Sequence, residues 1–230
     1  YAIYKMKKSI NEIRNIDDLV SFSTKFHERL VILPKRFRGI FSISPKQLRK
    51  EISKLLKIIA YLRPKALMET GTANGGTLFL FSGVADPNAI IISIDLPNGY
   101  PAWRIPLYKS FARGNQRIYL IRSDSHDPKT LIKVKKMLKN RRLDFLFIDG
   151  DHTYEGVKRD FEMYSPLMRS NGIIAFHDII PDYYTRYGIS TLAYTGGVPA
   201  FWNEIKSYYK YIEIVENPDQ DGYGIGVIYV

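Results

Sequence analysis

The feature that most restricts the fold of this chain is a regular alternation of short apolar runs and amphipathic segments from Lys65 onward. The apolar runs cover residues 66–70, 90–95, 117–122, 143–149 and 172–177. Between them lie amphipathic or mixed segments at residues 75–84, 104–113, 127–139 and 154–168. Repeated strand-then-helix patterns of this kind predict an α/β fold, with a mostly parallel sheet and helices on both of its faces.

The C-terminal part of the chain departs from this alternation. Its pattern predicts a helix over 199–210, followed by two strands over 211–216 and 223–230. The stretch from Pro218 to Gly222 supplies a turn between these strands, so we expect them to form an antiparallel hairpin.

The N-terminal part predicts a helical extension. Helical spacing of apolar residues covers 9–32 and 46–62. Ser44-Pro45 predicts the start of the second helix, because proline suits the first helical position, and Arg63-Pro64 predicts its end. The basic cluster at residues 35–38 predicts a loop between the two helices.

The excess of basic residues lies in this extension. Residues 1–65 hold 16 Lys/Arg against 5 Asp/Glu, whereas the remaining residues hold 18 of each, so the formal net charge of +11 is N-terminal. A basic extension can attract nucleic acid, a membrane surface or an acidic partner. No nucleic-acid-binding signature accompanies the charge, which favours a solvated helical face. We therefore divide the chain into a basic helical extension, 1–64, and an α/β domain, 65–230.

The composition excludes several classes of protein. The chain has no cysteine, which excludes disulfides, thiolate metal sites and cysteine nucleophiles. No apolar run approaches the roughly 18–20 residues of a membrane span, and the N-terminal residues lack the apolar region of a signal peptide. We expect a cytoplasmic protein without a membrane span.

A glycine-rich turn follows the first predicted strand. Gly71, Gly75 and Gly76 allow the backbone to turn tightly and approach a ligand, and the next helix begins here with unpaired N–H groups. Asp95 ends the second predicted strand, 24 residues after Gly71. Dinucleotide-binding folds place an acid that binds ribose hydroxyls at about this position.

Glu69 distinguishes between two kinds of nucleotide cofactor. The spacing Glu-x-Gly-x-x-x-Gly differs from the Gly-x-Gly-x-x-Gly of dehydrogenases. A carboxylate at this strand end would repel a pyrophosphate, but it complements a cofactor that carries sulfonium and ammonium groups. Glu69 therefore favours S-adenosylmethionine over NAD. Taken by itself, the turn could also serve only to reverse the chain.

The third and fourth predicted strands also end in polar residues. Ser123, Asp124 and Ser125 follow the third strand, where the loop of such folds reaches the adenine, although a helix N-cap explains part of this stretch equally well. The fourth strand ends in Asp149-Gly-Asp-His152. Because ligands bind beyond the carboxyl ends of parallel strands, we expect Asp149 and His152 in the site. Asp151 is better explained as a cap of the next helix.

These motifs resemble those of class I S-adenosylmethionine-dependent methyltransferases, in particular the branch of cephalosporin-hydroxylase-like proteins and sugar O-methyltransferases. The motifs that carry the resemblance are Glu69–Gly76, Ile94-Asp95, Phe147–Gly156, Asn171–Asp178 and Gly197–Trp202. The resemblance covers residues 45–230 and implies a Rossmann-like sheet of seven strands, mostly parallel, with an antiparallel C-terminal hairpin strand. The cofactor-binding residues that we predict are Glu69, Gly71, Thr72, Asn74, Gly75, Gly76, Asp95, Ser123, Asp124 and Ser125.

The resemblance also implies a divalent cation, most commonly Mg²⁺, beside the methyl group. The ligand positions correspond to Asp149, His177 and Asp178, and the position of the general base corresponds to His152. Such an ion lowers the pKa of a hydroxyl, and an imidazole accepts its proton at neutral pH. A histidine ligand suits Mn²⁺, Fe²⁺ or Zn²⁺ better than Mg²⁺. The alternatives are coordination by the two carboxylates alone, or no ion and an unaided histidine base.

The implied reaction is methyl transfer to a hydroxyl of a small molecule, such as a sugar, a phenol or a secondary metabolite. The tyrosine-rich loop at 179–198 is a candidate wall for this acceptor or a contact with a second subunit of a homo-oligomer. Two alternatives remain. One is a nucleic-acid methyltransferase that uses the basic extension, and the other is a protein that binds the cofactor without turnover.

Overall fold

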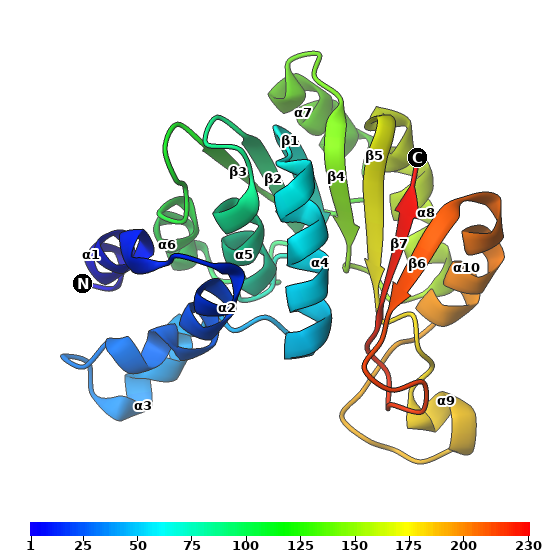
Figure 1. The fold of residues 1–230 in the computed structure, drawn as a ribbon, viewed down its shortest axis with the longest axis horizontal. Coiled ribbons are helices and arrows are strands. Elements are labelled where there is room, and N and C mark those ends of the chain that lie inside the picture. The colour runs from blue at the N-terminus through cyan, green and yellow to red at the C-terminus, as the bar shows by residue number, and fades with distance from the viewer.

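A single seven-stranded sheet forms the centre of the molecule, in the order β3-β2-β1-β4-β5-β7-β6 (Figure 1). This computed structural model describes the backbone of residues 1–230 and all side chains except that of Asn11. The strands are β1 (Ala66–Thr70), β2 (Ile90–Asp95), β3 (Arg117–Arg122), β4 (Leu143–Ile148), β5 (Met168–His177), β6 (Lys210–Ile214) and β7 (Ile225–Tyr229). Strand β7 runs in the direction opposite to the other six strands, so its pairings with β5 and β6 are antiparallel, whereas all other pairings are parallel. The predicted α/β class, the mostly parallel sheet and the C-terminal hairpin are confirmed.

Two helical layers cover the sheet. One layer contains α4 (Arg49–Leu62), α5 (Gly76–Val84) and α6 (Ile105–Lys109), and the other contains α7 (Pro128–Leu138), α8 (Tyr154–Tyr164) and α10 (Val198–Ile205). Successive strand residues serve opposite layers, since Leu67 packs in the first core and Met68 in the second. Central strands buried on both faces read as continuous apolar runs, which is why the sequence located them well.

The predicted helix over 9–32 is wrong, because the chain forms several short elements there. These are α1 (Ala2–Ser9), a 3₁₀ turn (Ile10–Glu12), α2 (Ile16–Lys25) and a second 3₁₀ turn (Phe26–Arg29). Asn15 separates them, since its side chain accepts a 2.8 Å hydrogen bond from the N–H of Asp18 and caps α2. Because apolar residues keep a helical spacing on both sides of Asn15, the sequence pattern did not reveal the break.

The expected loop at 35–38 and the expected helix start at Ser44-Pro45 are also wrong. Residues 35–38 form the short helix α3 (Lys35–Arg38), and α4 begins only at Arg49. The intervening segment 42–48 has no regular structure and packs beside the glycine-rich turn. The end of α4 is as predicted, because Arg63 adopts a left-handed conformation before Pro64.

The strand order places a switch point between β1 and β4. From β1 the chain adds β2 and β3 on one side, and it then returns to add β4 and β5 on the other side. Open α/β sheets bind ligands beyond the carboxyl ends of the strands at such a point. This edge is the lower one in Figure 1, where α3 and α9 (Tyr183–Tyr187) lie at opposite ends. Among the described residues, no helix is long and apolar enough to cross a membrane.

Candidate active site at the carboxyl edge of the sheet

A cleft of about 700 Å³ lies beyond the ends of β1, β2, β3 and β4. Seven of the residues that the sequence predicted for the site line it. They are Gly71, Asp95, Ser123, Asp124, Ser125, Asp149 and His152. Residues that follow β1, β2, β3 and β4 are therefore brought together at the predicted edge of the sheet.

At Gly71, the turn after β1 approaches the backbone at the end of β4. Its φ is +90°, and a Cβ atom here would lie 1.9 Å from the carbonyl oxygen of Asp149. No side chain fits in that space, and the left-handed backbone also favours glycine. Gly71 therefore allows the turn after β1 to lie directly against the end of β4.

The three later residues of the glycine-rich turn face the protein. Asn74 donates a 2.8 Å hydrogen bond to the carbonyl oxygen of Ser44. A Cβ atom on Gly75 would lie 2.7 Å from the ring of a buried tyrosine, and one on Gly76 would lie 2.6 Å from Pro45. Their predicted contact with a cofactor stays a prediction, whereas the contacts of Asn74 and Gly76 with segment 42–48 are features of the structure.

Glu69 lies beneath the cleft and is fully buried. Its Oε1 accepts a 2.7 Å hydrogen bond from Ser93, whose hydroxyl lies 2.5 Å from that of Thr72. Burial raises the pKa of Glu69 to about 8, although hydrogen bonds with Thr77 and Ser93 lower it in part. The glutamate is therefore mostly protonated at neutral pH, so the charge on which we based its selectivity for a sulfonium is largely absent.

Asp95 lies at the end of β2, and its carboxylate accepts hydrogen bonds from two turns, the one after β1 and the one after β2. Its Oδ2 accepts a 2.7 Å hydrogen bond from the N–H of Ala73, and its Oδ1 accepts one of 2.8 Å from Leu96. Gly99 leaves room for the carboxylate, since a Cβ atom there would lie 2.0 Å from Oδ1. Asp95 thus links the turns after β1 and β2 at the wall of the cleft.

The loop after β3 contributes a histidine that the sequence motifs did not single out. His126 lines the cleft next to Ser125, with its Nε2 3.3 Å from the buried carboxylate of Asp160. The hydrogen bond with Asp160 raises the pKa of His126 above its usual value, although burial opposes this. Its signal in the sequence was only its position directly after the loop Ser123–Ser125.

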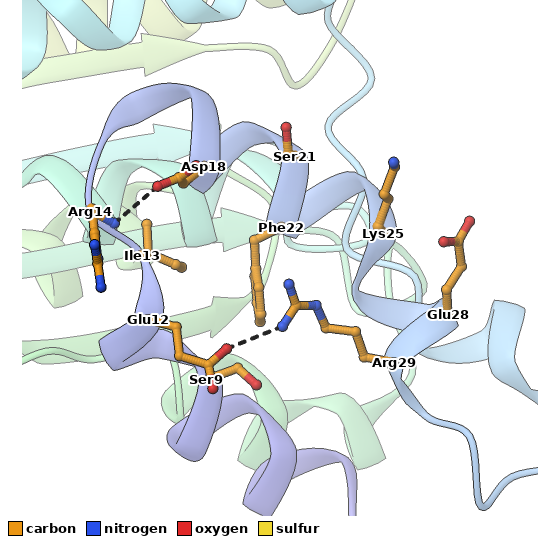
Figure 2. Close-up of a pocket in the computed structure, with 10 residues that line it drawn as sticks. All are labelled: Ser9, Glu12, Ile13, Arg14, Asp18, Ser21, Phe22, Lys25, Glu28 and Arg29. Atoms are coloured by element: carbon orange, nitrogen blue, oxygen red, sulfur yellow. Dashed lines mark hydrogen bonds and ion pairs between the residues drawn. The ribbon is translucent and has the colours of Figure 1, made fainter.

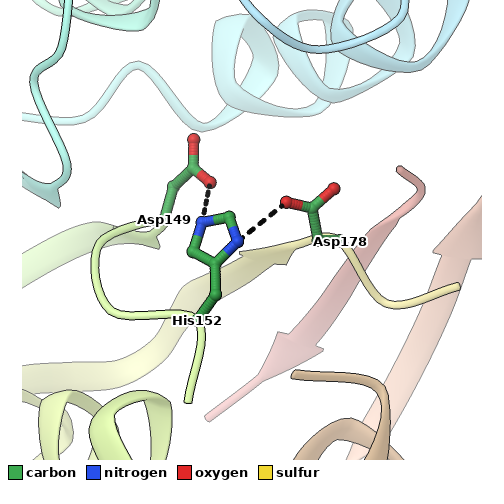
Figure 3. A group of neighbouring side chains, drawn as sticks. All are labelled: Asp149, His152 and Asp178. Carbon is green, nitrogen blue, oxygen red and sulfur yellow. Dashed lines mark ion pairs between the residues drawn. The ribbon is translucent and has the colours of Figure 1, made fainter. Parts of the chain in front are cut away.

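Asp149 and His152, which line the cleft, form a cluster with the side chain of Asp178 (Figure 3). The Nε2 of His152 lies 3.6 Å from Oδ1 of Asp149, and its Nδ1 lies 3.4 Å from Oδ2 of Asp178. Burial lowers the pKa of His152, but the hydrogen bond and charge of Asp149 and the charge of Asp178 raise it overall. These two carboxylates and one imidazole lie within 4.8 Å of one another, a donor set that can hold a divalent cation.

The tautomer of His152 follows from a backbone contact. Its Nδ1 lies 3.2 Å from the carbonyl oxygen of Tyr194, which can only accept a hydrogen bond. Nδ1 therefore carries the proton, and the lone pair of the neutral imidazole is on Nε2. The ring of Tyr194 stacks on the imidazole with an interplanar angle of 5°.

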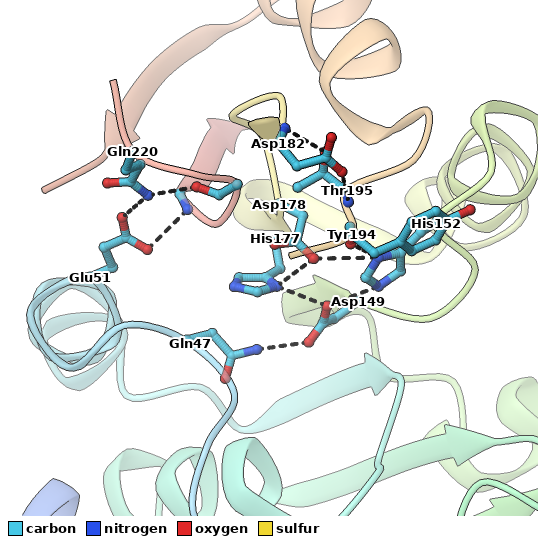
Figure 4. A network of polar contacts seen from close by, with 12 residues as sticks. Gln47, Glu51, Asp149, His152, His177, Asp178, Asp182, Tyr194, Thr195 and Gln220 are labelled. Atoms are coloured by element: carbon cyan, nitrogen blue, oxygen red, sulfur yellow. Dashed lines mark hydrogen bonds and ion pairs between the residues drawn. The ribbon is translucent and has the colours of Figure 1, made fainter. Parts of the chain in front are cut away.

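His177 completes a ring of alternating acids and imidazoles (Figure 4). Its Nδ1 lies 3.1 Å from both Asp149 and Asp178, on the side away from His152. Burial lowers the pKa of His177, but the charge of Asp149 and hydrogen bonds to both carboxylates raise it to about 10. The ligand atoms that converge most closely belong to Asp149, His152 and Asp178, so the geometry groups His152 with the two carboxylates. The predicted role of His177 as a ligand stays a prediction.

Asp178 enters the ring because its backbone leaves the strand direction. Its φ is +63°, in the left-handed region that aspartate tolerates better than most residues. Adjacent residues of a regular strand point to opposite faces. The left-handed turn allows His177, on β5, and Asp178, just beyond it, to reach the same neighbour, Asp149.

The tyrosine-rich loop after β5 is fastened at its base and exposed at its tip. Buried Asp182 accepts a 2.9 Å hydrogen bond from the N–H of Thr195, and the N–H of Gly197 donates to the carbonyl oxygen of His152 at 2.7 Å. Tyr184 and Tyr187 are exposed. The loop therefore brings Tyr194 to the cleft and leaves Tyr184 and Tyr187 exposed to solvent.

A second hollow, of about 640 Å³, lies between α1 and α2 in the N-terminal extension (Figure 2). Its charged lining residues include acids as well as bases, and Arg29 lies 3.3 Å from Glu12 in an ion pair. Mixed charge of this kind does not form a continuous basic surface for phosphates.

Comparison with known proteins identifies relatives of this fold. Residues 68–179 match the protein family described as a methyltransferase domain. The fold is similar to that of the O-methyltransferase TomG from Streptomyces achromogenes, involved in tomaymycin synthesis and solved in complex with SAM. The TM-score is 0.59 at 13% identity, over 97% of this chain and 93% of that one. A putative caffeoyl-CoA O-methyltransferase from Staphylococcus aureus gives a TM-score of 0.59 at 17% identity, over 99% and 98% of the two chains.

One curated relative is similar in sequence. The uncharacterized protein y4gI of Sinorhizobium fredii (strain NBRC 101917 / NGR234) is 26% identical over 127 residues. The match covers 53% of this chain but only 14% of that protein. This chain therefore spans a small part of its relative's length.

Proposed function

Because this chain is a class I S-adenosylmethionine-dependent methyltransferase, we propose that it transfers the methyl group to a hydroxyl oxygen of a small molecule. The observation that carries this proposal is that Asp149 and His152 line the same cleft as Gly71 and Asp95 and form a cluster with Asp178. Two carboxylates and an oriented imidazole suit the removal of a proton from a hydroxyl. The O-methyltransferases of similar fold are consistent with an oxygen acceptor.

The cofactor would lie along the turns after β1, β2 and β3. When bound, S-adenosylmethionine supplies an electrophilic methyl group on a sulfonium. In this proposal Asp95 would accept hydrogen bonds from ribose hydroxyls, and the loop Ser123–Ser125 would contact the adenine, since both line the cleft. Gly71 permits close approach of the backbone.

His152 acts as the general base in this proposal. Its Nδ1–H donates to the carbonyl oxygen of Tyr194, so Nε2 is free to take the acceptor proton. The charge of Asp149 beside Nε2 then stabilises the imidazolium. With the proton held on Nε2, the acceptor oxygen would be free to take the methyl group that the bound cofactor supplies, and this transfer would depend largely on in-line placement by the protein.

A divalent ion is the second candidate for this cluster, and the proximity of three ligand side chains favours it. Asp149, His152 and Asp178 would hold the ion, which would act as a Lewis acid on the acceptor hydroxyl. Nε2 of His152 would then be a ligand rather than a base. Chelation distinguishes the two: turnover that survives EDTA supports the base, and turnover restored by Mn²⁺ or Mg²⁺ supports the ion. Mn²⁺ binding measured by paramagnetic resonance gives a readout without turnover.

Asp149→Asn tests the assignment of the cluster. The change keeps the side-chain shape and removes the charge, so we expect turnover to fall about 1,000-fold. Calorimetric binding of S-adenosylhomocysteine should change little and reports that the variant is folded. The melting temperature should fall, because the imidazolium of His177 loses its charged partner. Asp86→Asn is the matched control, since it makes the same change in a turn at the amino end of β2, where Asp86 accepts a hydrogen bond from the N–H of Asn88. Formation of S-adenosylhomocysteine with a panel of sugars and phenols measures turnover, and full activity of Asp149→Asn would exclude the proposal.

Nucleic acid is the alternative acceptor. If the basic extension gripped phosphates, RNA or DNA binding would weaken steeply with salt. We expect no such binding in a salt titration, because acids and bases are mixed around the hollow of the extension. If the protein binds S-adenosylhomocysteine but turns over no acceptor, a cofactor-binding role replaces the enzymatic one.

A further inference from the structure

The N-terminal segment contributes a side chain to the catalytic cluster. Gln47 precedes α4, and its Nε2 donates a 2.8 Å hydrogen bond to Oδ2 of Asp149, 102 residues away (Figure 4). Gln47 is only 6% exposed. The contact joins the part of the chain that we separated as an extension to the residue at the centre of the site.

The orientation of the amide follows from the charge of its partner. The carboxylate of Asp149 lies 3.1 Å from Nδ1 of His177 and 3.6 Å from Nε2 of His152, and its oxygens accept hydrogen bonds. Gln47 must therefore present its N–H₂ group, and its Oε1 is buried without a hydrogen-bond partner among the described residues. A half-satisfied buried amide is unfavourable for folding, so stability does not explain why a glutamine stands here.

We propose that Gln47 is a positioning residue for Asp149, an inference that rests on the catalytic role proposed above. A free carboxylate rotates about its terminal bond. By holding Oδ2, Gln47 leaves Oδ1 directed at Nε2 of His152 and Nδ1 of His177. It thereby fixes the oxygen that orients the base or, with an ion present, the oxygen that binds it.

The segment that carries Gln47 is held on its N-terminal side by the glycine-rich turn. Asn74 donates to the carbonyl oxygen of Ser44, and Gly76 packs against Pro45. The Nη1 of buried Arg104 donates to the carbonyl oxygens of Ser42, at 3.2 Å, and Asn74, at 3.1 Å. The turn that borders the cofactor cleft therefore also sets the position of the segment.

The segment is held on its C-terminal side through α4. Glu51, one turn after Gln47, is buried and accepts hydrogen bonds from Nε2 of Gln220 at 2.9 Å and from the N–H of Gly224 at 3.0 Å (Figure 4). These contacts tie the start of α4 to the loop before β7. With both ends fixed, Gln47 has little freedom to follow a displaced Asp149.

The test compares Gln47→Leu with Gln116→Leu. Gln116 is also buried, and its Nε2 donates to the carbonyl oxygens of Ser82 and Asp86, so it reports the structural cost of losing a buried amide. We expect Gln47→Leu to lower kcat about 10- to 100-fold, with the KM for S-adenosylmethionine within about 2-fold. Gln116→Leu should lower the melting temperature and leave kcat within about 2-fold.

Two further measurements show whether the effect passes through Asp149. In an Asp149→Asn background, Gln47→Leu should have no additional effect on kcat, because residues that act as a unit are not additive. In the protein without substrate, the imidazole NMR signals of His152 and His177 should shift in Gln47→Leu and stay in place in Gln116→Leu. This second readout needs no acceptor, so it decides the inference even if methyl transfer is not found.

Three outcomes would overturn the proposal. One is a kcat of Gln47→Leu equal to that of the wild type. Another is a parallel loss of activity and melting temperature in both glutamine variants, which would make Gln47 merely structural. The third is an unchanged set of histidine signals in Gln47→Leu.

Discussion

The protonation of buried Glu69 leads to a prediction about stability. A glutamate ionises near pH 4.5 in the unfolded chain, but burial raises the pKa of Glu69 to about 8 in the folded protein. The stability that this raised pKa contributes is fully present below pH 4.5 and is lost as pH rises through 8. The loss is about 1.4 kcal/mol per pH unit and about 5 kcal/mol in full.

Glu69→Gln removes this ionisation while keeping the acceptor oxygen for Ser93. We expect the free energy of unfolding of the variant to exceed that of the wild type by an amount that grows between pH 5 and 8. Groups common to both proteins cancel in the difference, which urea denaturation at each pH measures. Glu162→Gln, at an exposed position of α8, is the control and should give a constant difference. A Glu69→Gln difference that is the same at pH 5 and pH 8 would refute the buried, protonated glutamate.

Three further predictions concern the walls of the cleft. Gly71→Ala should destabilise the fold by more than about 3 kcal/mol, since its Cβ would overlap the backbone of Asp149, whereas Gly39→Ala has open space and should change the denaturation midpoint little. Tyr194→Ala should raise the KM for the acceptor about 3- to 10-fold and spare the KM for S-adenosylmethionine, because it removes the ring stacked on His152 but keeps the backbone carbonyl. The value of kcat/KM should fall as the pH is lowered, with an apparent pKa above 6.5, because the neighbouring carboxylates raise the pKa of His152. If the same fall persists in His152→Gln, it belongs to another group.

The sequence predicted those parts of the structure in which local pattern and burial agree. The central strands are buried on both faces, so their apolar runs could be read directly, and parallel pairing brought Gly71, Asp95 and Asp149 to one edge. Gln47 could not be found in this way. Its pattern placed it inside a helix, and only tertiary packing shows that it lies before α4 and against Asp149.

Asp149 and Glu69 show why charge is harder to predict than position. Glu69 is buried and Asp149 is partly buried, at or near the carboxyl ends of the adjacent parallel strands β1 and β4, and the sequence treated both as anions. Asp149 meets the imidazolium of His177, which compensates its desolvation and keeps it ionised. Glu69 meets hydroxyl groups, which do not compensate a charge, so burial dominates and it retains its proton. The difference lies in His177, which follows β4 by 29 residues. The resemblance placed His177 beside Asp149 as a fellow ligand, and only the structure shows it as the charged partner of that acid. In the cofactor site proposed above, selectivity for S-adenosylmethionine would therefore rest on the shape of the turns and on Asp95 more than on the charge of Glu69.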